Sequence, residues 1–489
     1  MKKLLFLAIM SVVAATASAQ QKYVTEVQSE ANERWWGMDR WGGSWNLYMN
    51  ADADLELQFD TYMMVSSAGR YLWSEKPFDV DFDGDQMTVS SDSEKIEVQK
   101  GGKTLREAYL VCVHKNLPEG REVPSIDLFT HPVYKPGYRP DVTWGQGEIV
   151  EYARRIVAEG LPAGTIAIPE GWCSLNVPFA FSPELFPDPQ GMVAELHKMG
   201  FKVMLTVTPR IPAFGRVFTD AYRRGDIMPV DGTFGTLDVG KHSVYETFRQ
   251  GIGALKSQYA FDGFRLDGNA IPVSGANDPA LQNWAGLAGG IGMCELTGAY
   301  KHAFMPYVTE TDMPDPAAYP GFMLKSLLAA SLSGNIYKTA AYGGRYPQLE
   351  GVKLAEYMAA ALFFPSASVE FAPWEFGERN LYDHVKEALM FRASLADYME
   401  NLINESVRTG EPIARHMEYQ FPRQGFSDCD DQFMLGPKYL IAPCLDGAAS
   451  RMVRLPKGRW ADKHGKKYKG PLVTEAACNG GVIYFELTK

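Results

Sequence analysis

Residues 261–270 read FDGFRLDGNA, and this stretch belongs to the pattern that decides the fold class. A short run of strand-forming residues begins at Asp262 and ends at Asp267, followed by glycine and asparagine. Strand side chains alternate between two faces, so Gly263, Arg265 and Asp267 share one face. A nearby guanidinium favours an ionised carboxylate. We interpret Asp267 as a functional carboxylate and Asp262 as a cap or turn residue; the alternative is a structural ion pair at a barrel rim.

Similar short apolar segments alternate with helical stretches from about residue 135 to about residue 395. GTIAIPEGW and FKVMLTVTP are strand-like, and PQGMVAELHKMG between them has helical periodicity, with Met192 and Leu196 on one face and Gly200 as the stop. Further candidate strands are DGFRLDG, YVTET, NIYKTAAYGG and SVEFAPW. Repeated β/α units over about 260 residues predict a single parallel (β/α)₈ TIM barrel.

Two other segments flank this repeat. Residues 22–125 contain short alternating strands with polar turns, which is typical of an antiparallel β-sandwich, and strand-like segments return near the C-terminus. We therefore predict a multidomain α/β and β protein: an N-terminal β-sandwich over 20–130, the (β/α)₈ barrel over 131–400 and a C-terminal β-sandwich domain over 401–489.

The first 19 residues have the pattern of a signal peptide. Lys2 and Lys3 precede an apolar run that ends in Ala17-Ser18-Ala19, a small-x-small cleavage pattern. The run is shorter than the roughly 20 residues a bilayer requires, and no later stretch is long and apolar enough to span one. We expect cleavage near Ala19 and a periplasmic or secreted protein without a membrane span.

The net charge and the cysteine spacing limit which ligands and cofactors we expect. The formal net charge is -11, which disfavours nucleic acid and fits a neutral substrate better. Six cysteines lie far apart with no CxxC, so zinc is not indicated, and we expect neither a metal nor an organic cofactor. Their spacing allows one or two disulfides, whose pairing it does not define, or buried thiols. No pattern indicates an oligomeric state.

Polar residues follow several predicted barrel strands, where the active site of such a barrel gathers. YVTETDMPD (307–315) offers Glu310, Asp312 and Asp315, any of which could act as a proton donor if its environment raised its pKa. The alternative is that these acids solvate a loop.

Aromatic residues accompany acids at two further strand ends. Glu170 and Trp172 follow one strand, and Glu370, Trp374 and Glu375 follow another. Indole faces stack on sugar rings and carboxylates accept hydrogen bonds from hydroxyls, although such aromatics can also simply pack at a rim. Paired carboxylates with aromatic walls on a barrel indicate glycoside hydrolysis.

Several long stretches resemble glycoside hydrolase family 31, and within it the bacterial branch related to the myogenesis-regulating glycosidase. They are FSPELFPDPQGMVAELHKMGFKVMLTVTP, FDGFRLDGNA, MLKSLLAASLSG, FFPSASVEFAPWEF, TGEPIARHMEYQF and DDQFMLGPKYLIAPCL. The similarity runs from ERWWGMDRWGGSW to RLPKGRW, which covers most of the chain.

The resemblance implies a retaining α-glycosidase with a β-sandwich, a (β/α)₈ barrel and C-terminal β-domains. It implies that Asp267 is the nucleophile, with Arg265 two residues before it. Asp312 matches the family's general acid best, and Asp315 takes that place if the loop is shifted.

The resemblance also suggests substrate-binding residues. Trp35 and Trp36 would reach the barrel mouth from the N-terminal domain, while Glu170 and Trp172 would line the sugar subsite. Together with Trp35 and Trp172, Trp374 is a candidate stacking wall.

The chain departs from the family at four polar or aromatic positions, now occupied by Pro169, Thr206, Thr309 and Ala340. Each change removes a contact to the sugar, so the specificity must differ from that of well-known members. We expect a retaining exo-α-glycosidase that hydrolyses a terminal α-galactoside or α-glucoside. The alternatives are a non-hydrolytic carbohydrate-binding protein on the same scaffold and a transglycosylase.

Overall fold

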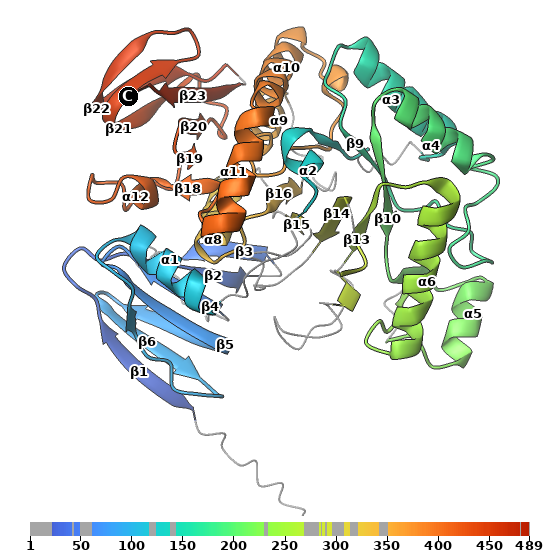
Figure 1. Cartoon of the computed structure of the whole chain (residues 1–489), viewed down its shortest axis with the longest axis horizontal. Coiled ribbons are helices and arrows are strands. Elements are labelled where there is room, and N and C mark those ends of the chain that lie inside the picture. Colours follow the sequence, from blue (N-terminus) through green and yellow to red (C-terminus); the bar gives the residue numbers. More distant parts are fainter. Residues whose placement is uncertain are drawn as a thin grey trace, which may run out of the picture.

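The computed structural model places three β-rich parts around a helical layer (Figure 1). The N-terminal sheets, in blue, and the C-terminal sheet, in red, lie on the same side of the barrel, whose first helices are green. No helix in the described part of the chain is long and apolar enough to cross a bilayer. The structure describes residues 22–41, 44–48, 61–116, 124–136, 143–228, 233–267, 283–284, 286–288, 291–295, 308–312, 321–341, 351–479 and 481–488, so the predicted signal peptide lies outside it.

The N-terminal part consists of antiparallel strands in the order β1-β6-β5-β4-β2-β3, with β7 paired to β5. The 14-residue strand β5 pairs with β6 through one half and with β4 through the other, so it joins two sheets around one apolar core. Their bounds are β1 (Tyr23–Gln28), β2 (Trp35–Trp41), β3 (Ser44–Tyr48), β4 (Thr61–Ser66), β5 (Arg70–Asp83), β6 (Gln86–Ser91) and β7 (Gln99–Lys100).

The central part confirms the predicted TIM barrel. Its strands follow the order β16-β15-β14-β13-β10-β9-β8-β17 in parallel pairs, and a parallel bridge between Thr339 and Ser366 joins the two ends. The strands are β8 (Val133–Tyr134), β9 (Thr165–Ile168), β10 (Lys202–Val207), β13 (Gly263–Asp267), β14 (Ile291–Glu295), β15 (Val308–Asp312), β16 (Lys338–Ala341) and β17 (Ser368–Val369).

Helices surround the barrel and shield its strands, most of whose residues are buried. Between β10 and α6 the chain adds a small excursion, in which the antiparallel pair β11 (Arg210–Pro212) and β12 (Phe234–Thr236) flanks α5 (Arg216–Arg223). The larger helices are α3 (Gln146–Ala158), α4 (Pro189–Lys198), α6 (His242–Tyr259), α8 (Phe322–Leu332), α9 (Gly351–Ala361), α10 (Arg379–Ser394) and α11 (Ala396–Thr409).

The C-terminal part is an antiparallel sheet in the order β18-β19-β20-β23-β21-β22. Its own apolar core includes Trp460, which is fully buried. The strands are β18 (Ala414–His416), β19 (Phe433–Leu435), β20 (Tyr439–Pro443), β21 (Ser450–Asp462), β22 (Lys467–Ala477) and β23 (Val482–Leu487), and the short helix α12 (Met417–Gln420) follows β18.

The two aspartates of FDGFRLDGNA lie at opposite ends of β13. Asp262, just before the strand, accepts a hydrogen bond from the Val203 N–H of β10 at 2.8 Å, and its carboxylate lies 2.8 Å from His197 Nε2 on α4. Asp262 therefore holds the start of β13 to β10 and α4, which is a structural role at the beginning of the strand. His197, off the apolar face of its helix, is its partner.

Strand β13 also packs unusually close to β14. Gly263 stands opposite Ile291 in the parallel register, and a Cβ atom placed on Gly263 would lie 1.6 Å from the Ile291 carbonyl oxygen. No side chain fits into that gap unless the two backbones separate, so glycine is required here for close approach rather than for its φ angle.

We expect Gly263→Ala to lower the free energy of unfolding by about 1–3 kcal/mol, because overpacking must push the two strands apart. Gly147→Ala on α3 is the matched control, since a Cβ there has open space around it. Urea midpoints followed by circular dichroism measure both. A Gly263→Ala midpoint equal to the wild-type value would show that the strands are not in contact as described.

The N-terminal part contacts both the barrel and the C-terminal sheet through β2 and β3. These strands contact α8, and β3 also contacts β15 of the barrel. The Trp36 ring of β2 meets the His416 ring of β18 edge-on, with centroids 5.2 Å apart. His416 is fully buried, its Nδ1 accepts the Glu418 N–H at 3.1 Å, and burial lowers its pKa from 6.5 to about 4.

This histidine should make the fold sensitive to acid. Between pH 6.5 and pH 4 the unfolded chain binds a proton that the folded chain excludes, so stability falls as pH falls through this window. From pH 7 to pH 4.5 the loss attributable to His416 is about 2 kcal/mol. We expect His416→Asn, whose amide oxygen can replace Nδ1 as acceptor, to lose that much less stability over the same range. Unfolding midpoints at both pH values measure this, and an unchanged pH dependence in the variant would contradict it.

Candidate active site

Asp267 is the last residue of β13 and stands at the carboxyl end of the barrel strands. It is 7% exposed, and its Oδ2 accepts a hydrogen bond from the Thr208 hydroxyl at 2.9 Å. Its backbone carbonyl accepts the Trp284 indole N–H at 3.0 Å. Arg265 lies two residues earlier on the same strand and is half-buried. The carboxylate is thus oriented by the residue that follows the neighbouring strand β10 and is shielded from bulk water.

The register of the next two strands brings further acids to the same end of the barrel. Asp267 pairs with Glu295 of β14, which in turn pairs with Glu310 of β15, so these three backbone positions stand at one level. Asp312 is the last residue of β15, two residues beyond that level and opposite Ala341. The predicted acid segment is therefore two strands away from Asp267.

Two further acids need separate comment, because one lies outside the described residues and the other was not predicted. Asp315, the alternative general acid, lies outside the described residues. Glu295 was not singled out from the sequence, although it ends the apolar run IGMC in the way that Asp267 ends FRL. That signal, an acid at the carboxyl end of a short apolar strand, could have identified it.

Glu170 and Trp172 follow β9, next to β10 in the barrel. Glu170 is exposed, whereas Trp172 is 5% exposed and donates its indole N–H to the Thr206 carbonyl at 2.7 Å. Both line a cavity of about 800 Å³ whose wall also includes Thr206 and Thr208. Thr208 therefore contacts Asp267 and belongs to the cavity wall, which makes the cavity and the carboxylate neighbours.

A buried ion pair stands where the barrel closes. Lys135 follows β8, Glu370 follows β17, and the Lys135 ammonium contacts the Glu370 carboxylate, with both side chains 9% exposed. Burial of charges is tolerated only when they are paired. Lys135 was not recognised in the sequence, because its partner lies more than two hundred residues away.

The N-terminal tryptophans do not occupy the predicted position. The β2–β3 hairpin reaches the barrel, but Trp35 and Trp36 are each 0% exposed. Trp35 lies in the core of the N-terminal sheets with Arg70 over its ring, and Trp36 packs against His416. The predicted stacking role must be corrected in this structure to a core role, because neither indole has a face open to a sugar.

Trp374 is half-buried and its described contacts are with the helical layer. It lies in the 3₁₀ turn η2 (Pro373–Glu375) after β17, with its ring centroid 5.3 Å from that of Tyr152 on α3. This is the packing alternative considered for rim aromatics. A sugar-stacking role for Trp374 stays a prediction.

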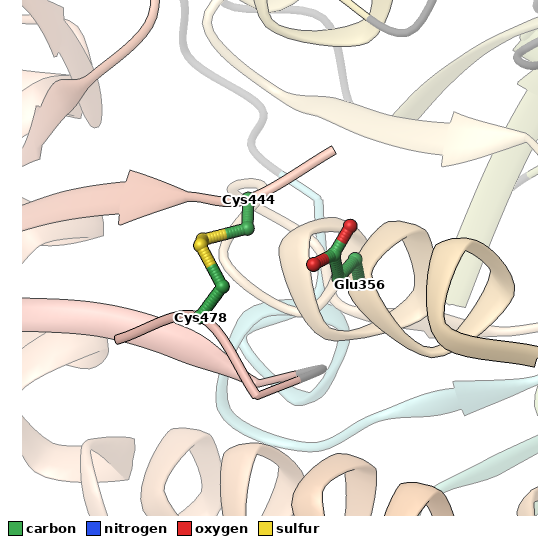
Figure 2. A group of neighbouring side chains, drawn as sticks. All are labelled: Glu356, Cys444 and Cys478. Carbon is green, nitrogen blue, oxygen red and sulfur yellow. A yellow bond between two sulfur atoms is a disulfide. The ribbon is translucent and has the colours of Figure 1, made fainter. Parts of the chain in front are cut away.

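One group of metal-ligating residue types lies close together among the residues described: Glu356, Cys444 and Cys478 (Figure 2). The two cysteines form a disulfide, so neither presents a thiolate to a metal in this state. Glu356 of α9 is fully buried and accepts the Gly447 N–H at 2.9 Å, and burial raises the pKa of its carboxyl. The group fastens the C-terminal sheet to a barrel helix. Of the other cysteines, Cys112, Cys294 and Cys429 are buried thiols and Cys173 is exposed.

Two family models match the chain. Residues 132–304 match the model described as the glycosyl hydrolases family 31 TIM-barrel domain, and residues 410–483 match the family 31 C-terminal domain. The first match covers the barrel through the segment after β14, and therefore includes Asp267.

Curated relatives are similar at low identity. The myogenesis-regulating glycosidase of Mus musculus is 22% identical over 408 residues, covering 74% of this chain and 56% of that protein. The α-glucosidase of Saccharolobus solfataricus is 26% identical over 241 residues, covering 45% and 31%, and the α-xylosidase XylQ of Lactiplantibacillus pentosus is 23% identical over 349 residues, covering 62% and 45%. The chain thus spans about half or less of the length of these relatives.

Solved structures share the fold over nearly the whole chain. A GH31 α-xylosidase from a soil metagenome, complexed with xylose, superposes with a TM-score of 0.78 at 18% identity, covering 96% of this chain and 79% of that one. A Flavobacterium johnsoniae GH31 dextranase complexed with glucose gives 0.78 at 16% identity, covering 95% and 66%. A GH31 sulfoquinovosidase from E. rectale gives 0.75 at 15% identity, covering 96% and 83%.

Proposed function

Since this chain belongs to glycoside hydrolase family 31, we propose that it is a retaining exo-α-glycosidase acting on a terminal α-galactoside or α-glucoside. The placement of Asp267 carries the proposal. A shielded carboxylate that accepts a hydrogen bond from Thr208 and borders a large cavity has the position and support that a nucleophile requires.

The reaction follows double displacement. An Asp267 oxygen attacks the anomeric carbon while the bond from that carbon to the leaving oxygen breaks, and Asp312 donates a proton to this oxygen. Asp312, now a base, takes a proton from water, whose oxygen attacks the same carbon and releases Asp267. Two inversions leave the product with the configuration of the substrate.

The relatives and the chain's own substitutions bear on the substrate. The similar proteins include an α-glucosidase, an α-xylosidase and a dextranase, which favours an α-linked sugar as the substrate. Thr206 and Ala340, which replace larger family residues at the barrel strands, are 2% and 1% exposed. These losses favour a specificity of its own, and they also keep open the second candidate, a protein that binds carbohydrate without hydrolysing it.

We also propose that the mature protein is exported to the periplasm or secreted. The pattern of residues 1–19 motivates this proposal, and the Cys444–Cys478 disulfide supports it because disulfides persist in oxidising compartments.

The direct test is a panel of p-nitrophenyl α-galactoside, α-glucoside, α-xyloside and α-sulfoquinovoside. We expect turnover of at least one by the wild type, and a loss of about 10⁴-fold or more in Asp267→Ala, because no other group replaces the nucleophile. Proton NMR should show that the sugar released first, before mutarotation, is the α anomer.

The matched control is Asp262→Ala, at the other end of the same strand. It removes the anchor to Val203, so it should lower stability while turnover by the folded fraction persists. Sugar binding without turnover in both the wild type and Asp267→Ala would instead establish the carbohydrate-binding alternative, and a β first product would exclude retention.

The assignment of Asp312 has its own test. Loss of a general acid slows departure of a poor leaving group by about 10²–10⁴-fold but affects an activated one far less. We therefore expect Asp312→Asn to reduce kcat/KM strongly for the methyl glycoside and weakly for the glycosyl fluoride. Glu310→Gln serves as comparison, and if it shows this leaving-group dependence while Asp312→Asn does not, the acid is Glu310.

A further inference from the structure

The cavity beside Asp267 has a wall of unusual chemistry. Its inner end is the carboxyl edge of β9 and β10, and its outer end is the excursion that contains β11, α5 and β12. Five phenylalanines line it: Phe179, Phe214, Phe218, Phe234 and Phe248. A second sugar residue needs hydroxyl partners on most of its edges, whereas this wall offers mainly ring faces and aliphatic carbon.

Several polar groups of the wall are already engaged. The Thr208 hydroxyl donates to Asp267, and the Ser182 hydroxyl donates to Glu184 at 2.7 Å. The guanidinium of Arg210 lies over the Phe234 ring at 5.9 Å. The wall therefore has fewer free hydrogen-bonding groups for a ligand than its composition suggests.

Apolar surface at the cavity rim is left in contact with water. Phe214 is 61% exposed, Phe234 44% and Leu175 40%. Exposed apolar groups that cluster at the mouth of a cavity mark a binding surface, because their hydration is unfavourable until a ligand covers them. Their clustering here, rather than their exposure as single residues, carries the argument.

One wall residue is held in a costly backbone conformation. Phe179 has φ of 52°, which a bulky side chain adopts at a cost of about 1–3 kcal/mol. Its ring packs edge-on to Phe248, with centroids 5.2 Å apart, and against Gly251 of α6, where a Cβ would lie 2.4 Å from the ring. Helix α6 thus has a glycine where Phe179 needs space, and the ring is positioned on the cavity wall.

We propose that this cavity binds the leaving group of the substrate, and that the leaving group is an apolar, aromatic alcohol rather than a second sugar. The inference rests on the proposed glycosidase function. Thr208 places the cavity next to the nucleophile. In-line displacement puts the glycosidic oxygen on the side of the anomeric carbon away from Asp267, where Asp312 protonates it, so the alcohol beyond that oxygen extends across the barrel mouth to the phenylalanines. A volume of about 800 Å³ accommodates a ligand of several rings.

The test compares three glycosides of the sugar identified by the panel: methyl, 2-phenylethyl and a disaccharide with the same linkage. The two simple alcohols are similar leaving groups, so the ratio of their kcat/KM values reports binding of the phenyl group rather than activation. We expect the 2-phenylethyl glycoside to exceed the methyl glycoside by at least about tenfold, and also to exceed the disaccharide.

The cavity itself is tested by two variants with matched controls. Phe214→Ala removes rim surface and Gly251→Ala displaces Phe179, so each should reduce the phenylethyl-to-methyl ratio by about threefold or more. The matched controls are Met452→Ala and Gly253→Ala, which should leave the ratio unchanged. Met452 is an exposed apolar residue on β21 of the C-terminal sheet, and Gly253 lies two residues further along α6, where a Cβ atom has open space around it. Thermal unfolding identifies any variant that fails to fold.

Two results would overturn the proposal: a phenylethyl-to-methyl ratio near one in the wild type, or a disaccharide that is the better substrate. If no glycoside is turned over, the proposed function fails separately, and calorimetric binding of methyl α-glucoside, 2-phenylethyl α-glucoside and an α-linked glucose disaccharide to the wild type decides the question. Tighter binding of the 2-phenylethyl glycoside by the same ratio supports the cavity assignment, and equal binding of all three rejects it.

Discussion

The parallel pairing of β13 with β10 and β14 is the constraint on which the candidate site depends. Asp262 anchors the beginning of β13 to β10, and Gly263 allows β14 to approach to backbone contact. With the start of the strand placed in this way, Asp267 reaches the carboxyl edge of the barrel level with Glu295 and beside Thr208. A shift by one residue would turn Asp267 to the opposite face of the strand.

The mouth of the barrel combines two environments. On the side of β13, β14 and β15, the strand ends carry acids, and the ion pair of Lys135 with Glu370 closes the circle at β8 and β17. On the side of β9 and β10 the lining becomes aromatic. Cleavage of the glycosidic bond needs charged side chains near the anomeric carbon, whereas binding of an apolar leaving group needs an apolar surface from which water is displaced. The barrel mouth places the acidic strand ends and the aromatic lining next to each other.

Much of this arrangement could be predicted from local sequence pattern. Alternating apolar strands and helices indicated the barrel, and alternation within FDGFRLDGNA was enough to separate Asp262 from Asp267. Such inference succeeds because each signal lies within one short segment. Local pattern identifies Asp267 as the acid that ends its strand. Whether Glu295 and Glu310 lie at the same height in the barrel as Asp267 depends on the register of the strands, which local pattern does not define.

Features that depend on contacts between distant parts of the chain could not be predicted, because the signals in the sequence are local. Trp35 and Trp36 were expected at the barrel mouth, yet both are buried, Trp35 in the core of the N-terminal sheets and Trp36 against the distant His416. The spacing of six cysteines did not define the disulfide Cys444–Cys478, and nothing in the sequence near Lys135 predicted its ion pair with Glu370. Resemblance to a family points to motifs in the sequence, but burial is decided by how whole sheets and helices meet.

The β2–β3 hairpin has a consequence for how this protein could be divided or recombined. Since it packs on α8 and β15, and Trp36 contacts β18, the N-terminal sheets share an apolar core with the barrel and meet the first strand of the C-terminal sheet. A barrel excised at its first strand would expose apolar surface that normally never meets water. The three parts are separate in sequence and in sheet topology, but they meet around Trp36. A chimera that takes one part from a homologue would therefore need that homologue's contact surfaces around Trp36 as well.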